Sequence, residues 1–221
     1  MTRRVPDGPE GRDEAVRVLE AGGVIALPTD TVYGIAVSLA ARGGLERLFA
    51  AKQRPLDKGI VLLLESAAQA ARAGVMTPAA STLAGAFWPG GLTLIVPQRH
   101  DVPWPEALTG GAETIGLRVP DHDAPRTLAR ALGPLPTTSA NVSGQPEASD
   151  AAAIVAQLGH AIELVLDGGP ARGGPPSTVV DCSGAWPTIL RSGALPAAEL
   201  AAVLERAGID HDLREPRTEA P

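Results

Sequence analysis

Two uninterrupted apolar runs, residues 24–27 and residues 60–64, constrain the fold of this chain more than any other feature. A strand with one solvated face alternates apolar and polar residues, whereas a strand covered on both faces is apolar throughout. Segments such as 43–52 and 78–87 instead carry apolar residues at the spacing of helices. We therefore expect an α/β protein whose sheet has helices on both faces.

The chain is long enough to form one domain with a sizeable core, because it has 221 residues. We assign the domain to residues 12–208. The flanking segments 1–11 and 209–221 are polar and contain Pro and charged residues, a composition typical of flexible termini. The sequence contains no long apolar run and no signal-peptide pattern, which favours a cytoplasmic protein without a membrane partner.

Charge and cysteine content exclude several classes of protein. The formal net charge of -6 argues against binding of nucleic acid through overall charge, so an anion site must be a local concentration of cations. The single cysteine, Cys182, excludes an internal disulfide and a zinc site made of cysteines. The histidines lie in loops or at helix ends, and we interpret all of them as surface residues: His100, His122, His160 and His211.

The lysines mark the first candidate site. Of the 19 Lys and Arg residues, only Lys52 and Lys58 are lysines. Lys52 ends the predicted helix 43–52 on its apolar side, and Pro55 stops that helix soon after. One explanation is a need for a compact ammonium, with Lys52, Arg54 and Lys58 forming a cradle for a polyanion. The alternative is a lysine that complements the helix dipole while its stem packs on the surface.

A second candidate site lies on the predicted strand 114–119. Its residues alternate, so that Thr114, Gly116 and Arg118 share the face opposite the apolar residues. A Gly between two polar residues lets a ligand approach the backbone closely. The alternative is an ordinary solvated face that carries an Arg.

Two loops rich in hydroxyl groups follow predicted extended segments, and both end in Gly. They are residues 29–34 and residues 139–144. Open α/β sheets place ligands where strands run into such loops. A set of basic residues at strand or helix ends near hydroxyl or amide groups suits the binding of phosphates and a carboxylate. These basic residues are Lys52, Arg54, Lys58, Arg118 and Arg191.

Common nucleotide-binding motifs are missing from the sequence. It has no Walker A loop, and no G-x-G-x-x-G motif follows a predicted strand. With no histidine in a motif, catalysis would rest on positioning and charge stabilisation, with little acid–base chemistry by side chains.

Taken together, these segments resemble the YrdC-type threonylcarbamoyl-AMP synthase family. The resemblance is carried, in order, by residues 24–34, 52–64, 114–120, 137–144, 177–181 and 189–193. It implies a twisted mixed parallel and antiparallel sheet flanked by helices, with a concave, positively charged cleft. It also implies a nucleotidyltransferase, L-threonylcarbamoyladenylate synthase. Such an enzyme forms threonylcarbamoyl-AMP and pyrophosphate from L-threonine, bicarbonate and ATP, for the threonylcarbamoyladenosine modification of tRNA.

The resemblance also implies roles for individual residues. The catalytic residues are Lys52 and Arg54. The L-threonine site comprises Thr31, Tyr33, Lys52, Arg118, Thr137 and Ser177. The ATP site comprises Arg54, Lys58, Thr114, Ser139, Asn141 and Arg191. No protein metal site is implied, and Mg²⁺ is expected to arrive with ATP. Downstream tRNA threonylcarbamoyl-transferase proteins are the implied partners, with tRNA as a further candidate.

The chain departs from the family pattern at three places. Many relatives have Asn-Pro where this chain has Lys58 and Gly59, and His where it has Leu63. Many also have Ser where it has Glu147. One phosphate contact is therefore expected to be missing or to move to Ser149.

Other functions stay open at this point. One is an RNA-binding or ribosome-maturation module that uses the same face, although an acidic chain offers few cations for it. Another is a carbamoyl-adenylating transferase domain like that of hydrogenase-maturation proteins, which usually belongs to larger, Cys-rich chains. The third is a protein that only binds a nucleotide.

Overall fold

The computed structural model describes residues 2–55 and 58–214. Within these ranges, ten strands form one sheet in the order β1-β8-β2-β3-β7-β4-β6-β5-β9-β10. The strands are β1 (Arg3–Pro6), β2 (Ile25–Leu27), β3 (Gly34–Ala36), β4 (Val61–Leu63), β5 (Leu92–Pro97), β6 (Thr114–Arg118), β7 (Leu135–Ser139), β8 (Leu164–Asp167), β9 (Thr178–Asp181) and β10 (Thr188–Arg191). The helices are α1 (Pro9–Glu20), α2 (Gly44–Lys52), α3 (Ala67–Ala73), α4 (Pro78–Phe87), α5 (Glu106–Thr109), α6 (Asp123–Leu132), α7 (Ala151–Leu158) and α8 (Ala197–Arg206).

Parallel and antiparallel pairs are mixed in the sheet, as expected. β8 pairs in parallel with β1 and β2, whereas β2, β3, β7 and β4 follow one another in antiparallel pairs. On the other side, β4 and β6 are parallel, β6 and β5 antiparallel, β5 and β9 parallel, and β9 and β10 antiparallel. Because β8 lies between β1 and β2, and β7 between β3 and β4, late segments of the chain complete a sheet that early segments begin.

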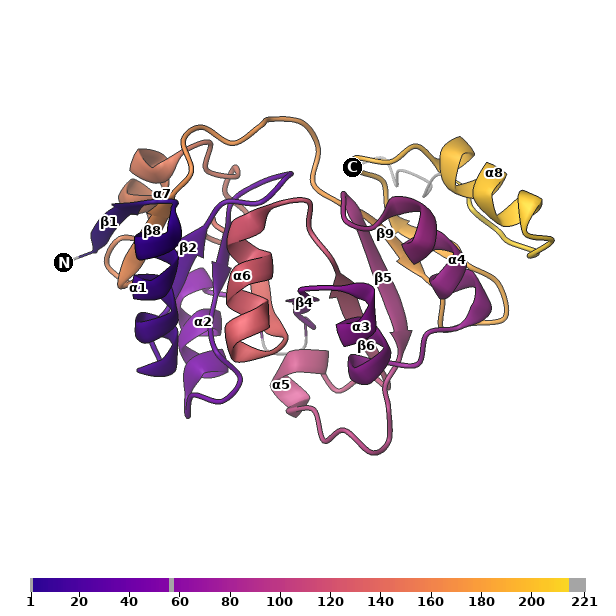
Figure 1. Cartoon of the computed structure of the whole chain (residues 1–221), viewed down its shortest axis with the longest axis horizontal. Helices are drawn as coiled ribbons and strands as arrows, with labels where there is room; N and C mark the ends of the chain where they lie inside the picture. Colours follow the sequence, from indigo (N-terminus) through magenta and orange to yellow (C-terminus); the bar gives the residue numbers. More distant parts are fainter. Residues whose placement is uncertain (1, 56–57, 215–221) are drawn as a thin grey trace.

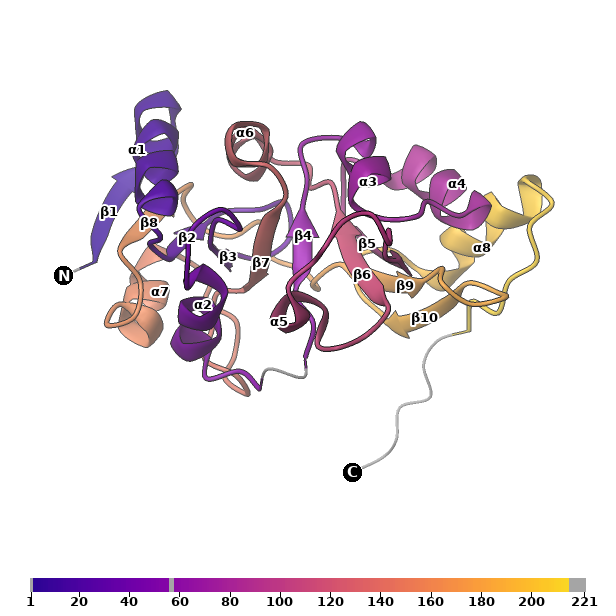
Figure 2. The same cartoon turned by 90° about the horizontal axis from the view of Figure 1, so that it is seen from below.

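Helices cover both sides of the sheet (Figures 1 and 2). α1 packs against β2 and β8, and α6 packs against β4, β7 and α1. Figure 2 shows α7 and α2 on the side of the strands opposite to α1 and α6. α3 packs on β6 and α4 on β5, while α8 lies against α4. Within the described residues, no helix has the length and apolarity needed to cross a membrane.

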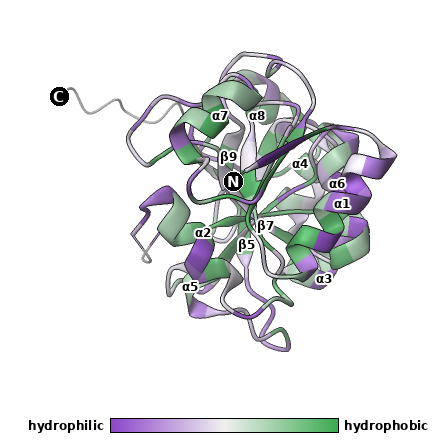
Figure 3. Cartoon of the chain, turned by 90° about the vertical axis from the view of Figure 1, so that its left-hand side faces the viewer, coloured by the Kyte–Doolittle hydropathy of each residue, from purple (hydrophilic) through white to green (hydrophobic). Residues whose placement is uncertain are grey.

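The predicted central strand is buried except at Val61, which is partly exposed. In the run 60–64, Leu62 and Leu64 are completely buried and Ile60 is 3% exposed. Burial of a Leu or Ile side chain contributes about 1.5–3 kcal/mol relative to exposure. Figure 3 shows the apolar strands inside and hydrophilic residues on the outer surfaces of the helices. The apolar run therefore corresponds to a strand that packs side chains on each of its faces.

The N-terminal segment differs from the loose lead-in that its composition predicted. β1 pairs in parallel with β8, and α1 begins at Pro9, within the segment 1–11 that was expected to be flexible. An uncovered edge of β8 would leave backbone N–H and C=O groups unpaired, and any extended backbone can satisfy them. The prediction of a flexible segment from composition alone was therefore wrong for residues 2–11, which contain a strand and the start of a helix.

The C-terminal segment also has contacts that were not expected. Leu213 is 7% exposed and belongs to the main apolar core, and Asp212 forms a parallel bridge with Thr188 of β10. Residues 215–221, the rest of the predicted flexible terminus, lie outside the described residues.

Candidate functional site

The central strands gather the candidate residues on a single face. Val61 pairs with both Gly116 and Thr137, and Gly34 pairs with Ser139. Directly paired residues point to the same face, and so do residues two positions apart on one strand. This face therefore carries Gly34, Val61, Leu63, Gly116, Arg118, Thr137 and Ser139.

A cavity of about 190 Å³ opens on this face. Most of the predicted site residues line it: Thr31, Tyr33, Arg54, Arg118, Thr137, Ser139, Ser177 and Arg191. Pockets for drug-sized ligands measure roughly 300–1,000 Å³. The enclosed volume thus suits an amino acid, and a nucleotide would have to extend through the open mouth.

Arg118, the last residue of β6, lines the cavity. Its Nη2 donates to Asp30 Oδ1 at 2.7 Å, its Nη1 to Thr31 Oγ1 at 3.0 Å, and its Nε to the Gly90 carbonyl at 3.0 Å. The Arg118 and Asp30 side chains are only 7% and 8% exposed. Burial lowers the pKa of Arg118, and Asp30 opposes that effect. Each terminal nitrogen has a second N–H, so the guanidinium can also donate to a ligand carboxylate.

Lys52 lies behind the cavity wall, at the C-terminal end of α2, and is 3% exposed. Its Nζ faces four oxygens: Asn141 Oδ1 at 2.7 Å, Ser139 O at 2.8 Å, Ser139 Oγ at 3.0 Å and Asn141 O at 3.1 Å. A rotating ammonium can share three N–H donors among them, whereas a planar guanidinium would not fit the same space. Burial lowers the pKa of Lys52 to about 8, with Arg54 adding to the decrease and Glu147 opposing it.

Arg191 reaches the cavity because β10 contains a bulge. The register between β9 and β10 shifts just before Arg191, which pairs with Val179. Regular pairing would place Leu190 opposite Val179 and turn Arg191 to the other face. Instead, Leu190 is 56% exposed, and Arg191 Nη2 donates to the Ser177 carbonyl at 2.8 Å and to Ser177 Oγ at 3.1 Å.

Of the remaining residues predicted to bind ATP, one lines the cavity and three do not. Arg54 lines the cavity and donates from Nε and Nη2 to the carbonyls of Lys58 and Gly59. Lys58 is exposed, Thr114 is half-buried at the start of β6, and Asn141 is buried around Lys52. These three do not line the enclosed cavity. Residues 56 and 57 of the predicted cradle lie outside the described residues.

All four predicted threonine-site hydroxyls form hydrogen bonds within the protein, and two of them, on Tyr33 and Thr137, donate to backbone carbonyls. The Tyr33 hydroxyl donates to the Gly169 carbonyl at 2.6 Å and accepts from the Gly168 N–H at 3.0 Å. The Thr137 hydroxyl donates to the Leu135 carbonyl at 2.9 Å. Both residues line the cavity, so Tyr33 presents its ring there while its hydroxyl anchors the turn after β8.

Three polar residues of the site were not assigned from the sequence. Thr93 is the polar residue of an otherwise apolar strand, which was the available signal, and its hydroxyl lies 2.8 Å from Ser177 Oγ. Asp30 lies in the hydroxyl-rich loop and was assigned no role, although its carboxylate forms the ion pair with Arg118. Glu147, noted only as a departure from the family pattern, lines the cavity. Two residues from the other departures also line the cavity: Gly59, and Leu63, which forms part of its apolar wall.

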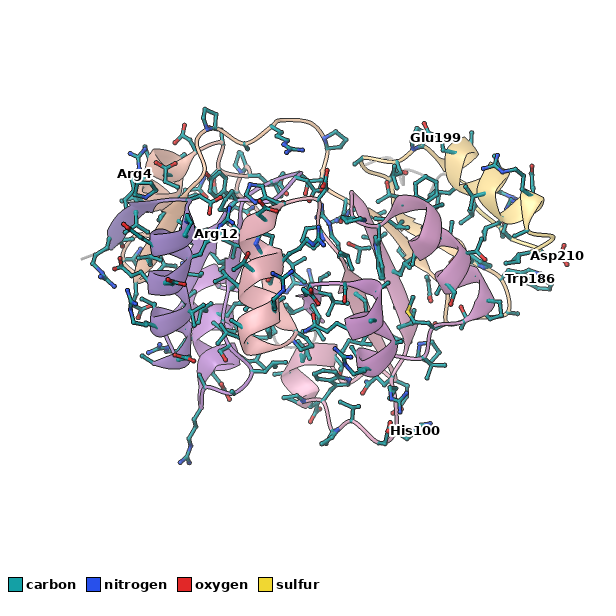
Figure 4. The ribbon with its side chains drawn as sticks, viewed as in Figure 1. Arg4, Arg12, His100, Trp186, Glu199 and Asp210 are labelled. Carbon is teal, nitrogen blue, oxygen red and sulfur yellow. The ribbon has the colours of Figure 1, made fainter. Side chains whose placement is uncertain are left out.

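Within the described residues, the cysteine and the histidines are not among those that line the cavity. Burial raises the pKa of the Cys182 thiol to about 12, so it carries no thiolate near neutral pH. No histidine lines the cavity, and Figure 4 shows His100 on an outlying loop. His122 is less exposed than predicted, because its Nδ1 caps α6 by accepting from the Ala124 N–H at 3.1 Å. No group of three His, Cys, Asp or Glu side chains in the described ranges could hold a metal ion.

Comparison with known proteins assigns the chain to a family. The Sua5_yciO_yrdC family model, described as "Telomere recombination", matches residues 17–193. The chain belongs to the Sua5/YciO/YrdC family. A threonylcarbamoyl-AMP synthase of Bacillus subtilis is 34% identical over 204 residues, which cover 91% of this chain and 59% of that protein. A putative threonylcarbamoyl-AMP synthase of Mycobacterium tuberculosis is 36% identical over 197 residues, which cover 89% and 88%.

Solved structures of the Sua5/YciO/YrdC family share the fold. Sua5 of Pyrococcus abyssi complexed with L-threonine superposes with a TM-score of 0.84 at 33% identity, over 92% of this chain and 61% of that chain. E. coli YciO superposes with a TM-score of 0.80 at 28% identity, over 89% and 98%. The predicted mixed parallel and antiparallel sheet flanked by helices is thereby confirmed. The chain spans less than two thirds of the length of the B. subtilis and P. abyssi proteins.

Proposed function

We propose that the chain is an L-threonylcarbamoyladenylate synthase, a nucleotidyltransferase that uses L-threonine, bicarbonate and ATP. The observation that carries the proposal is the composition of the cavity: the buried guanidinium of Arg118, several hydroxyl groups and the further cations Arg54 and Arg191 line it together. Relatives at 34–36% identity are named threonylcarbamoyl-AMP synthases, and the P. abyssi relative is complexed with L-threonine.

L-Threonine would occupy the enclosed end. Arg118 would hold its carboxylate through the second N–H of each terminal nitrogen, while Thr31 and Ser177 offer hydroxyl groups to its polar atoms. The Tyr33 ring and Thr137 would form the walls against its side chain. Lys52 would act from behind, by holding Ser139 and Asn141 in position.

The triphosphate would lie at the mouth, against the guanidinium groups of Arg54 and Arg191 and the hydroxyl of Ser139. Lys58 and Thr114 lie outside the enclosed part and would contact the outer portions of the nucleotide. Asn141 would contribute by fixing the loop after β7. Catalysis in this arrangement comes from positioning and charge stabilisation, since the site contains no histidine or thiolate.

The reaction balances without a protein nucleophile. The threonine amine and bicarbonate form a carbamate with loss of water. A carbamate oxygen then bonds to the α-phosphorus of ATP, the bond from that phosphorus to the oxygen bridging to the β-phosphate breaks, and pyrophosphate leaves with the electron pair. Arg54 and Arg191 would stabilise the negative charge that develops on the leaving group. Mg²⁺ supplies further charge neutralisation when it is bound to ATP.

The product is a mixed anhydride that must be passed to a second enzyme. We propose tRNA threonylcarbamoyl-transferase proteins as the downstream partners and a role in tRNA modification in the cytoplasm. Direct contact with tRNA would require cations beyond the cavity, and the net charge of -6 offers few.

The proposed function is tested by pyrophosphate release from ATP. Release should require L-threonine and bicarbonate together, and omission of either should reduce it to background. Serine, alanine and glycine in place of threonine serve as matched controls for the amino-acid site. Release at the full rate with ATP alone would contradict the synthase and leave an ATP hydrolase.

A further inference from the structure

Two buried hydroxyl groups of the cavity share one hydrogen bond, although they carry two protons. Thr93 and Ser177 are 1% and 5% exposed, both line the cavity, and their side-chain oxygens lie 2.8 Å apart. Arg191 Nη2 also donates to Ser177 Oγ, at 3.1 Å. Within the described residues, neither hydroxyl forms a further hydrogen bond. One of the two protons is therefore left for a ligand.

The pair lies between the strands that carry Arg118 and Arg191, in a row across β6, β5, β9 and β10. The register of β5 against β6, continued by one residue, places Thr93 beside Arg118. On its other side Thr93 pairs with Val179, and Arg191 pairs with the same residue. Neighbouring strands are about 4.8 Å apart, so the backbones of Arg118 and Arg191 are separated by roughly 14 Å. A free hydroxyl proton between two guanidinium groups suits a ligand that brings an anionic oxygen.

The direction of the shared hydrogen bond follows from access to the cavity. Ser177 is the more exposed of the two residues, so a ligand reaches its hydroxyl before that of Thr93. Thr93 then donates to Ser177 Oγ, and Arg191 donates to the same oxygen. A hydroxyl has two acceptor sites and one proton. With both acceptor sites occupied, Ser177 can only donate to the ligand.

Thr31 has the opposite polarity. The Thr29 hydroxyl donates to the Val32 carbonyl at 2.7 Å, so the Thr31 hydroxyl is the donor in the 3.2 Å bond between these two threonines. Arg118 Nη1 donates to Thr31 Oγ1 at 3.0 Å. Thr31 is left with one acceptor site and no proton. The cavity thus offers a donor at Ser177 and an acceptor at Thr31, which match the carboxylate and the amine of an amino acid.

We propose that Thr93 is a positioning residue that fixes the Ser177 hydroxyl as a donor to the carboxylate of the bound amino acid. The carboxylate would then lie between Ser177 and Arg118, with the amine turned toward Thr31. The inference rests on the proposed function, because it needs an amino acid in the cavity, and it adds the orientation of that amino acid. The competing role for Thr93 is structural: its side chain would only fill the wall between β6 and β9.

The test is a double-mutant cycle, measured by calorimetric titration with L-threonine alone. Thr93→Val keeps the branched shape but removes the hydroxyl, and it should weaken threonine binding about tenfold, because the Ser177 proton is no longer directed at the carboxylate. Ser177→Ala should weaken binding at least as much. The double variant should bind threonine no more weakly than Ser177→Ala, because Thr93 acts through Ser177. Thr93→Ser, which restores the hydroxyl, should recover most of the affinity.

A second ligand identifies the group that the Ser177 hydroxyl contacts. L-2-Aminobutyrate keeps the carboxylate and the amine of threonine but lacks the side-chain hydroxyl, and displacement of threonine measures its affinity. Thr93→Val should weaken aminobutyrate by the same factor as threonine. An unchanged affinity for aminobutyrate would mean that Ser177 donates to the side-chain hydroxyl of threonine, and would overturn the inference.

Thr77→Val is the matched control, because the Thr77 hydroxyl caps α4 outside the cavity. It should leave threonine affinity unchanged. Unchanged threonine affinity in Thr93→Val, or losses that add up in the double variant, would refute the coupling to Ser177. A larger loss in Thr93→Val than in Ser177→Ala would mean that Thr93 contacts the ligand itself, which also overturns the inference. Failure of wild-type protein to bind threonine would overturn the proposed function as well, whereas the other results remove only this inference.

Discussion

Replacing Arg118 by Ala should affect threonine binding and stability together, because the guanidinium has a ligand side and a protein side. On the protein side it pairs with Asp30 at 2.7 Å, with both side chains less than a tenth exposed. Removal of one partner from a buried ion pair costs about 3–5 kcal/mol, since the other charge stays buried and unpaired. On the ligand side, a charge-assisted hydrogen bond contributes about 1.5–3 kcal/mol, which corresponds to a dissociation constant raised roughly ten- to a hundredfold.

The double variant Asp30→Asn with Arg118→Ala separates the two effects. Removing the orphaned charge should restore a large part of the free energy of unfolding, while threonine affinity should stay as low as in the single variant. Urea denaturation measures the free energy of unfolding, and calorimetry measures threonine and ATP binding separately. ATP affinity should change little in either variant, because the proposed function assigns the phosphates to Arg54 and Arg191.

Two results would refute this reasoning. An Arg118→Ala protein as stable as wild type would mean that the Asp30 carboxylate can stay in its place without Arg118 at no cost in the free energy of unfolding. Collapse of ATP affinity with threonine affinity intact would mean that the two ends of the cavity are assigned the wrong way round.

The remaining predictions concern Lys52 and Tyr33. Lys52→Arg should abolish pyrophosphate release nearly as fully as Lys52→Ala, because four oxygens at 2.7–3.1 Å enclose the ammonium, and retention of most of the turnover would contradict that packing. ATP affinity measured without threonine or bicarbonate should fall as pH rises through about 8, the pKa to which burial lowers Lys52. An ATP affinity that does not change up to pH 9.5 would exclude a role for the charge of Lys52. The unfolded chain keeps this proton up to the ordinary value of 10.5, so between about pH 8 and 10.5 the group makes the free energy of unfolding rise with pH, opposite to its effect on ATP affinity. Tyr33→Phe should lower the free energy of unfolding by about 1–3 kcal/mol, because the Gly168 N–H and the Gly169 carbonyl in the turn after β8 lose their partner. Threonine affinity should change little, and a large loss of threonine affinity in calorimetry would mean that the Tyr33 hydroxyl contacts threonine.

Local patterns in the sequence predicted the parts of the site that depend on neighbours along the chain. Alternation placed Arg118 on the face opposite the apolar residues of β6, and apolar spacing placed Lys52 at the buried end of α2. The fold class followed from the apolar runs together with the family resemblance. These features are set within a few residues, where helix and strand periodicity act.

The missed features depend on contacts between distant segments. The pairing of β1 with β8 joins residues far apart in the chain, and composition carries no signal for it. Asp30 becomes a partner of Arg118 only once the loop after β2 folds over the end of β6. The bulge that turns Arg191 into the cavity is a property of the pairing between β9 and β10, so its orientation could not be derived from the order of residues in β10 alone.

The sheet order also has a consequence for synthesis of the protein on the ribosome. Thr31 emerges early, but the strands that complete its surroundings arrive much later: β7 separates β3 from β4, and β10 carries Arg191. Contacts of such long sequence separation form slowly, because a large loop must close before they can contribute. A nascent chain that ends before residue 188 can therefore have a buried Arg118 and a formed central sheet while it lacks Arg191. Under the proposed function, such an intermediate would bind an amino acid before it could bind a nucleotide, so binding of L-threonine and then of ATP should appear in that order as the chain lengthens.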